Sequence, residues 1–280
     1  MTASQHAIVT VCWGPLEGTK AAIAPGAALT VGRGEAAGLR LPDDAALAPI
    51  HFEVRWDGAR AELRHRAGLE LTLLGGQAIE VAALAHGQWI RAGGTDFLFH
   101  LEAHTPPAAP REPAALAAAE QALAALRRRP GTLYAMLDLA RDSRIAELLR
   151  ESIEPCRSLF DGVEGARLAE AAPHVARVAP GSRLCADLVR EGWGLRWGAW
   201  LASERPLAEV RRHLRKFLLV QLEGSPAPTY FRFYDPDVLR VYLGTCTDSE
   251  RAQWFGDVAT AYLGEDPSAP DGWWIEPARR

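Results

Sequence analysis

An arginine, a histidine and an alanine near the N-terminus have the types and spacing of an incomplete phosphate-binding site. Gly32-Arg33 follows an apolar segment, and His51 opens the next segment of mixed apolar and polar residues. The guanidinium of Arg33 could grip a phosphate through a fork of two hydrogen bonds. Ala48, three residues before His51, offers no side-chain donor. The pattern therefore predicts one half of an anion site without its other half.

Short strands must position these residues. Between residues 6 and 102, segments such as AIVTVCW, LTVGR, HFEVRWD, AELRHR and TDFLFHLE follow one another closely. Gly-rich or Asp-Gly breaks separate several of them, and no helical period intervenes. Regular short strands of this kind are typical of an all-β sandwich, whose loops gather at its ends.

At these residues the first hundred positions resemble the forkhead-associated (FHA) family, a β-sandwich whose loops bind phosphothreonine. The family pattern runs Gly-Arg, then Ser-x-x-His, then two Asn-Gly pairs separated by a short strand. Gly32-Arg33 and His51 match, Ala48 stands at the serine position, Glu70 stands in the earlier Asn-Gly pair, and Gly75-Gly76 occupies the final pair. The resemblance implies that the arginine and serine bind phosphate, the asparagine binds the peptide backbone, and the histidine braces the loop.

The departures from that pattern predict a degenerate site. Ala48 cannot donate a hydrogen bond, and Glu70 would repel a dianion unless it points away. Asp43 and Asp44 add further negative charge nearby. We therefore expect the sandwich to serve as a docking surface that does not read phosphothreonine in the usual way. The alternative is that its arginine and histidine only stabilise the loops; micromolar, phosphate-dependent binding through Arg33 would contradict both.

The chain changes character after a Pro-rich stretch, HTPPAAPREP, at 104–113. Four prolines in ten residues interrupt both sheet and helix. An Ala-rich helical segment follows, and from Thr132 predicted strands and helices are mixed. The predicted fold class is multidomain, an all-β FHA-like sandwich followed by an α/β domain in which helices cover a mixed sheet. The expected boundaries are 1–103 for the sandwich, 104–130 for the linker and lead-in helix, 131–264 for the α/β domain, and 265–280 for an irregular Trp-containing tail.

No catalytic or metal-binding pattern emerges. GxSxG, GxxxxGK[ST] and HExxH are absent from the sequence, and the four cysteines form no CxxC or Cys/His cluster. Asp138, Asp142 and His174 are the residues on which a hydrolase could rely. Aspartates at helix starts are more often caps, and a lone histidine after a proline is more often structural. We expect no enzyme activity, no cofactor and no metal; an uncharacterised hydrolase is the alternative.

Residues with the composition of contact surfaces occur instead in the C-terminal part. In LAEVRRHLRKFLL, apolar positions at helical spacing face a core, and basic side chains occupy the other sides. In TYFRFYDPD, alternate positions place a Tyr-Arg-Tyr set on one strand face, a composition typical of interfaces. Two adjacent tryptophans lie within the tail. The effector-binding candidates are Arg211, Arg212, Arg215, Lys216, Tyr230, Arg232, Tyr234, Trp273 and Trp274. The alternatives are a solvated basic face and a tail that folds back onto its own domain.

The order of segments LYAMLD, SLFDG, WG, HLRKFLLVQL, FRFYDPDVL and TCT, from residue 132 to 263, resembles the effector-adaptor (chaperone) domain of type VI secretion, long known only as a domain of unknown function. The resemblance implies a non-catalytic adaptor that binds a cognate toxic effector and helps to load it onto the VgrG spike. Other secretion components would dock on the FHA-like domain. A phosphothreonine-dependent scaffold that regulates secretion is the alternative from the signalling class.

Charge and hydropathy limit the partners. The formal net charge is −4, so we expect no nucleic-acid partner held by bulk electrostatics. No basic segment followed by an apolar run opens the chain, and no run reaches the ~20 apolar residues that span a bilayer. We therefore expect a cytoplasmic protein with no membrane contact.

Overall fold

The computed structural model describes residues 5–14, 16–67, 70–107, 110–129, 131–160, 171–221, 228–266 and 269–277. The chain divides into two compact units. The first comprises Met1–Pro106 with Arg150–Ile153, and the second comprises Pro107–Leu149 with Glu154–Arg280. The division at Pro106 falls inside the Pro-rich stretch. The local sequence also predicts a short helix over RLAEAAP, residues 167–173, and a hairpin whose turn lies at 222–227. Residues 167–170 and that turn lie outside the described residues.

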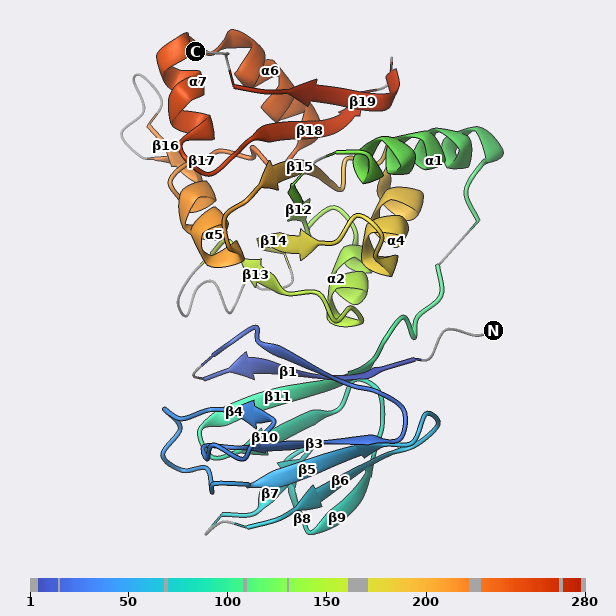
Figure 1. The fold of residues 1–280 in the computed structure, drawn as a ribbon, viewed down its shortest axis with the longest axis vertical. Coiled ribbons are helices and arrows are strands. Elements are labelled where there is room, and N and C mark those ends of the chain that lie inside the picture. Colours follow the sequence, from blue (N-terminus) through green and yellow to red (C-terminus); the bar gives the residue numbers. More distant parts are fainter. Residues whose placement is uncertain are drawn as a thin grey trace. The chain divides into compact units, whose positions relative to one another are not determined.

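The first unit is an all-β sandwich, as predicted (Figure 1). One sheet has the order β2-β1-β11-β10-β7-β8 and the other the order β4-β3-β5-β6-β9. The strands of the first sheet are β1 (Ala7–Trp13), β2 (Lys20–Ile23), β7 (Thr72–Leu74), β8 (Gln77–Ile79), β10 (Trp89–Ala92) and β11 (Thr95–Leu101). Those of the second are β3 (Ala27–Gly32), β4 (Leu39–Arg40), β5 (Phe52–Trp56), β6 (Ala61–His65) and β9 (Val81–Leu84).

Alternation along the strands builds the sandwich core. In β1, Ala7, Val9 and Val11 point inward, and Phe52 of β5 meets Phe97 of β11 with ring centroids 5.2 Å apart. These inward residues have at most a few per cent of their surface exposed. The hydrophobic period of two in the sequence therefore sets which side of each strand faces the other sheet.

The second unit is a sheet covered by helices on both faces (Figure 1). The strand order is β13-β14-β12-β15-β18-β19, and each described pairing is antiparallel. Its strands are β12 (Thr132–Asp138), β13 (Cys156–Ser158), β14 (Pro173–Val178), β15 (Gly198–Ser203), β18 (Ala261–Asp266) and β19 (Ala269–Ile275). A separate two-stranded ladder pairs β16 (Leu219–Val220) with β17 (Thr229–Tyr230).

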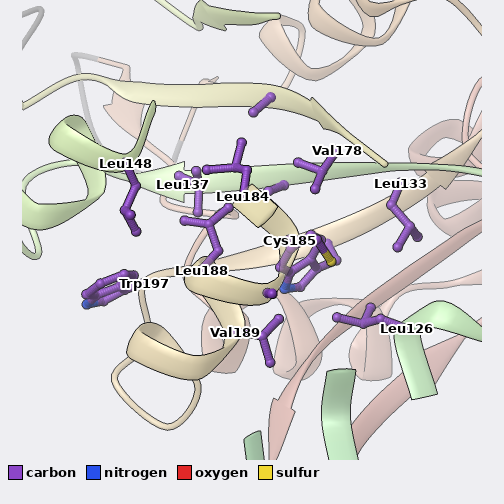
Figure 2. Close-up of a cluster of buried hydrophobic side chains, with 14 of the residues drawn as sticks. Leu126, Leu133, Leu137, Leu148, Val178, Leu184, Cys185, Leu188, Val189 and Trp197 are labelled. Atoms are coloured by element: carbon purple, nitrogen blue, oxygen red, sulfur yellow. The ribbon is translucent and has the colours of Figure 1, made fainter. Parts of the chain in front are cut away.

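The central strand β12 shows how the two faces are divided. Leu133, Ala135 and Leu137 belong to one buried cluster, and Tyr134 and Met136 belong to the other. Helices α1 (Pro113–Arg127), α2 (Ser143–Arg150) and α4 (Arg183–Gly192) cover the first face. Helices α5 (Leu207–Arg215), α6 (Pro236–Thr245) and α7 (Asp248–Phe255) cover the second. Figure 2 shows the first cluster between β12 and α4.

Two expectations about elements are wrong. The local pattern of DSERAQWFGDVATAYLG, residues 248–264, predicts one helix, but α7 ends at Phe255 because Gly256 adopts φ +54°, and Ala261 begins β18. The tail was expected to be irregular, but Ala269–Ile275 pairs with β18 and forms the last strand of the sheet. Adjacent tryptophans are compatible with a strand, because successive side chains point to opposite faces.

Candidate binding surfaces

Backbone contacts bring the Arg33 loop and the Ala48 segment together. The N–H of Arg33 donates to the Ala48 carbonyl at 3.0 Å, and the N–H of Gly34 donates to the Pro49 carbonyl at 3.0 Å. A Cβ on Gly32 would lie 2.3 Å from the Pro49 carbonyl oxygen, so this approach requires glycine. The Gly-Arg pair is therefore held against Ala48 by the main chain.

His51 fastens the same loop from inside. Its Nδ1 accepts a hydrogen bond from the Ala48 N–H at 3.2 Å, and its own N–H donates to the Val31 carbonyl at 2.8 Å. Burial and the neighbouring His65 lower the pKa of His51, against the smaller opposing effect of nearby carboxylates. A neutral ring with Nδ1 as acceptor fits that environment. The ring braces the loop and is fully buried.

The predicted ligands of an anion are only partly assembled. Arg33 is exposed and forms no ion pair within the described part of the chain. Glu70 is exposed, and Gly75 and Gly76 form the open β7–β8 turn with φ of +56° and +86°. The side chain of Ala48 provides no donor. One free guanidinium beside a methyl group is a weaker phosphate site than an arginine with a hydroxyl.

Asp44 does not add its charge to this surface as expected. It is buried, and its carboxylate accepts hydrogen bonds from the Thr95 hydroxyl at 2.6 Å and from the N–H groups of Gly94 and Ala46 at 3.0 and 3.1 Å. The carboxylate instead ties the loop before Ala48 to the turn between β10 and β11. Of the two aspartates, only Asp43 remains exposed.

In the second unit, helix α5 divides its basic residues between two roles. Its apolar positions Val210 and Leu214 are fully buried, as the helical spacing predicts. Arg211 donates from Nε to the Ser158 carbonyl at 2.6 Å, and Arg215 donates from Nε to the Leu159 carbonyl at 3.1 Å. These two arginines hold the end of β13 and the residues after it.

The other two basic residues are available to a partner. Arg212 and Lys216 are exposed, and they lie one helical turn apart. Neither has an ion-pair partner among the described residues. The predicted basic face is therefore reduced to these two side chains.

The Tyr-Arg-Tyr set does not share one strand face. Strand β17 ends at Tyr230, which is 59% exposed, whereas Tyr234 is only 8% exposed. Arg232 is an ion-pair partner of the buried Asp138, the last residue of β12. Asp235, next to Tyr234, caps α6 and pairs with Arg141 at 2.7 Å. Because these tertiary contacts hold the residues after Tyr230 outside the strand, the three side chains do not alternate regularly and do not share one face.

A half-exposed apolar contact forms around Tyr230. Leu219 of β16 lies directly opposite Tyr230 and is 50% exposed. The Tyr230 ring also contacts Phe160, with centroids 5.3 Å apart. We call Phe160, Leu219 and Tyr230 the hairpin surface. The sequence pattern did not single out Leu219, which lies in the continuous apolar run 217–220. In a strand, successive side chains point to opposite faces, so the burial of Leu218 places Leu219 on the exposed face.

The tail tryptophans lie on strand β19 and pack onto their own domain. Trp273 lies over Gly264, where a Cβ would come within 2.7 Å of its ring. The guanidinium of Arg129 lies over the Trp274 ring, 4.0 Å from the ring centroid. The Trp274 indole N–H donates to Glu276 at 2.7 Å. Both rings are half-buried. These contacts agree with the alternative in which the tail folds back onto its own domain.

The residues of the hydrolase alternative each have a structural partner. Asp138 binds Arg232, Asp142 accepts the Arg144 N–H at 2.9 Å at the start of α2, and a ring nitrogen of His174 lies 2.9 Å from the Ala172 carbonyl. Within the described ranges no group of three or more His, Cys, Asp or Glu side chains is placed to hold a metal ion. None of the helices in those ranges is long and apolar enough to cross a membrane.

Comparisons with known proteins cover the two units separately. Residues 133–253 match the family described as Domain of unknown function (DUF4123). That match excludes α1 and the β18–β19 pair. No curated protein is similar enough to the chain to count as a match.

Similar solved structures correspond to FHA domains. A domain from a study of phosphothreonine-dependent FHA interactions is 25% identical and covers 36% of this chain and 98% of its own, with a TM-score of 0.31. The FhaA FHA domain is 26% identical, with coverages of 34% and 99% and a TM-score of 0.31. The FHA domain of an Arabidopsis thaliana protein is 21% identical, with coverages of 38% and 92% and a TM-score of 0.34.

Proposed function

We propose that the protein is a non-catalytic type VI secretion adaptor that binds a cognate toxic effector and helps to load it onto the VgrG spike. Its second unit would hold the effector, and its sandwich would dock other secretion components without reading phosphothreonine. The match of residues 133–253 to DUF4123 and the resemblance of the segment order to effector adaptors support this proposal. When the adaptor binds the folded effector, it stabilises the effector by mass action. Loading onto the spike would then release the effector.

The hairpin surface carries the proposal. Leu219 and Tyr230 expose half or more of their surface side by side, although the adjacent Leu218 is buried. Tyrosine is enriched at the energetic centres of interfaces, where an apolar ring and a hydroxyl act together. Arg212 lies on α5 and Lys216 caps its C-terminus ahead of β16, and both supply positive charge. An amphipathic or acidic segment of an effector fits this composition.

Substitution in the hairpin surface should abolish client retention. We expect Tyr230→Ala and Leu219→Asp to reduce copurification of the toxin encoded beside this gene by about tenfold or more, as loss of an interface hot spot does. The melting temperature should change by only a few degrees, because both side chains are exposed. The measurement is the toxin-to-adaptor ratio after co-expression with the neighbouring toxin and VgrG genes.

Val241→Asp provides the matched control, because Val241 is 63% exposed on α6 outside the hairpin surface. We expect that variant to retain the client. Loss of the client in Val241→Asp with retention in Tyr230→Ala would move the binding surface to α6. Recovery of neither toxin nor spike component with the unaltered protein would contradict the adaptor function.

A phosphothreonine-dependent scaffold is a second candidate, favoured by the exposed Arg33 and the intact His51–Ala48 brace. We expect the unaltered protein to show no phosphate-dependent peptide binding. The double variant Ala48→Ser/Glu70→Asn should gain it, because it adds a donor and removes a like charge. Calorimetric titration with paired phosphorylated and unphosphorylated peptides measures this. Micromolar, phosphate-dependent binding by the unaltered protein, lost in Arg33→Ala and kept in Arg91→Ala, would establish the scaffold instead.

A further inference from the structure

A small cavity in the second unit has one carboxylate in its wall. Its volume is about 20 Å³, and it is partly open. Trp193, Trp197, Trp200 and Glu265 contribute to its lining. A cavity of about 10–15 Å³ by this measure holds one water molecule. The space therefore fits a single group of that size, such as a water or a primary ammonium.

One carboxylate oxygen of Glu265 receives no hydrogen bond from the part of the chain that the structure describes. The side chain lies on β18 and is 6% exposed. Its Oε2 accepts the N–H of Gly194, whereas Oε1 is buried and has no partner among the described residues. Burial raises the pKa of Glu265, although N–H groups of the 194–196 loop and the charge of Arg196 oppose the shift. A buried carboxylate oxygen without a donor is costly, so this arrangement suits a donor from outside.

The aromatic walls are held in place by glycines. A Cβ on Gly192 would lie 2.4 Å from the Trp197 ring, and a Cβ on Gly272 would lie 2.9 Å from the Trp193 ring. The indoles therefore pack directly on main chain. Trp197 and Leu188, both labelled in Figure 2, belong to the buried cluster and also line the cavity. Indole rings fixed beside a carboxylate can accept a cation on their faces.

Arg196, a basic side chain whose charge acts on Glu265, is already engaged elsewhere. Arg196 follows Gly194 in the same loop, and its guanidinium forms an ion pair with Asp237 of α6. Its backbone adopts φ +58°, an unusual conformation for a residue with a side chain, and this conformation belongs to the loop whose N–H groups face Glu265. The guanidinium of Arg196 is thus directed to Asp237 and does not satisfy Oε1.

We propose that this cavity binds the ammonium group of a lysine side chain from a bound polypeptide. The ammonium has the size of the water that the cavity would hold, can donate one of its N–H groups to Glu265 Oε1, and would lie among indole rings. A guanidinium is too wide for the same space. The proposal deepens the proposed function, since it gives the client one chemical requirement, but the site is on the adaptor alone and can be tested without any client.

The probe is N-acetyl-lysine-N-methylamide, titrated into the full-length protein and followed by tryptophan fluorescence and indole N–H resonances. We expect saturable binding that shifts the signals of Trp193 and Trp197. Glu265→Gln should weaken it at least tenfold, with its circular dichroism spectrum and melting temperature kept close to those of the unaltered protein. Glu204→Gln, which alters an exposed carboxylate of the same unit, should have no effect.

Uncharged probes decide whether the ammonium is what binds. N-acetyl-norleucine-N-methylamide and the Nε-acetylated lysine probe should not bind. The proposal would be overturned by any of three results: equal binding of these uncharged probes, unchanged affinity in Glu265→Gln, or no saturable binding of the lysine probe. A water molecule would then be the occupant of the cavity. Binding of methylammonium without binding of the lysine probe would overturn the assignment to a polypeptide. Failure here leaves the toxin copurification result unchanged, so the two proposals are separately testable.

Discussion

Replacing Trp254 with alanine is expected to lower the free energy of unfolding by about 3–5 kcal/mol, the cost of deleting a large buried aromatic side chain. Trp254 is 2% exposed and lies at the centre of the cluster on the α5–α6–α7 face. Its ring stacks on Phe217 at 4.0 Å and contacts Phe231, Phe233, Tyr242 and Tyr262 at centroid distances of 5.4 to 6.0 Å. Those rings cannot collapse into the space without breaking their other contacts.

Chemical denaturation of the full chain measures this effect. We expect Trp254→Phe to lose less stability than the alanine variant, because a smaller cavity remains. Trp89→Ala should change stability by less than about 0.5 kcal/mol, as exposed substitutions do, since Trp89 is 52% exposed. An equal cost for Trp254→Ala and Trp89→Ala would contradict the description of Trp254 as the centre of this core.

The second large effect is expected at Asp44. Asp44→Ala should destabilise the sandwich by about 3 kcal/mol, because it removes charge-assisted hydrogen bonds and leaves buried donors unsatisfied. The Thr95 hydroxyl and the N–H groups of Gly94 and Ala46 would lose their acceptor. The loop leading to Ala48 would loosen with them, so any ligand of the Arg33 surface should also bind less well.

Asp43 offers a control of the same chemistry at the adjacent position. Its side chain is exposed, and Asp43→Ala should change stability by less than about 0.5 kcal/mol. Thermal unfolding of the two variants, with amide hydrogen exchange at Gly94 and Ala46, measures the difference. Similar melting temperatures for Asp43→Ala and Asp44→Ala would show that the buried carboxylate does not organise the loop.

Local patterns predicted much of the fold. Apolar residues at a period of two gave the strands of the sandwich, and Val210 and Leu214 at helical spacing gave the buried face of α5. The prediction of a sandwich followed by a sheet covered with helices is confirmed. The errors occurred where a contact distant in sequence overrides local preference, as at β18–β19, where pairing between strands converts a predicted helix end and an irregular tail into sheet.

The sequence by itself determined which groups could serve: a lone arginine beside an alanine in the serine position, a histidine that can brace, and an amphipathic segment around Tyr230. Only the tertiary structure decided which of them are available. Arg211, Arg215 and Arg232 bind main-chain carbonyls or a buried aspartate, whereas Tyr230 and Leu219 stay exposed. Glu265 likewise becomes a candidate ligand only because folding buries it in the wall of a cavity. The reason is physical, because burial and unsatisfied hydrogen-bonding capacity are properties of the neighbours that folding brings together, and local sequence does not encode them.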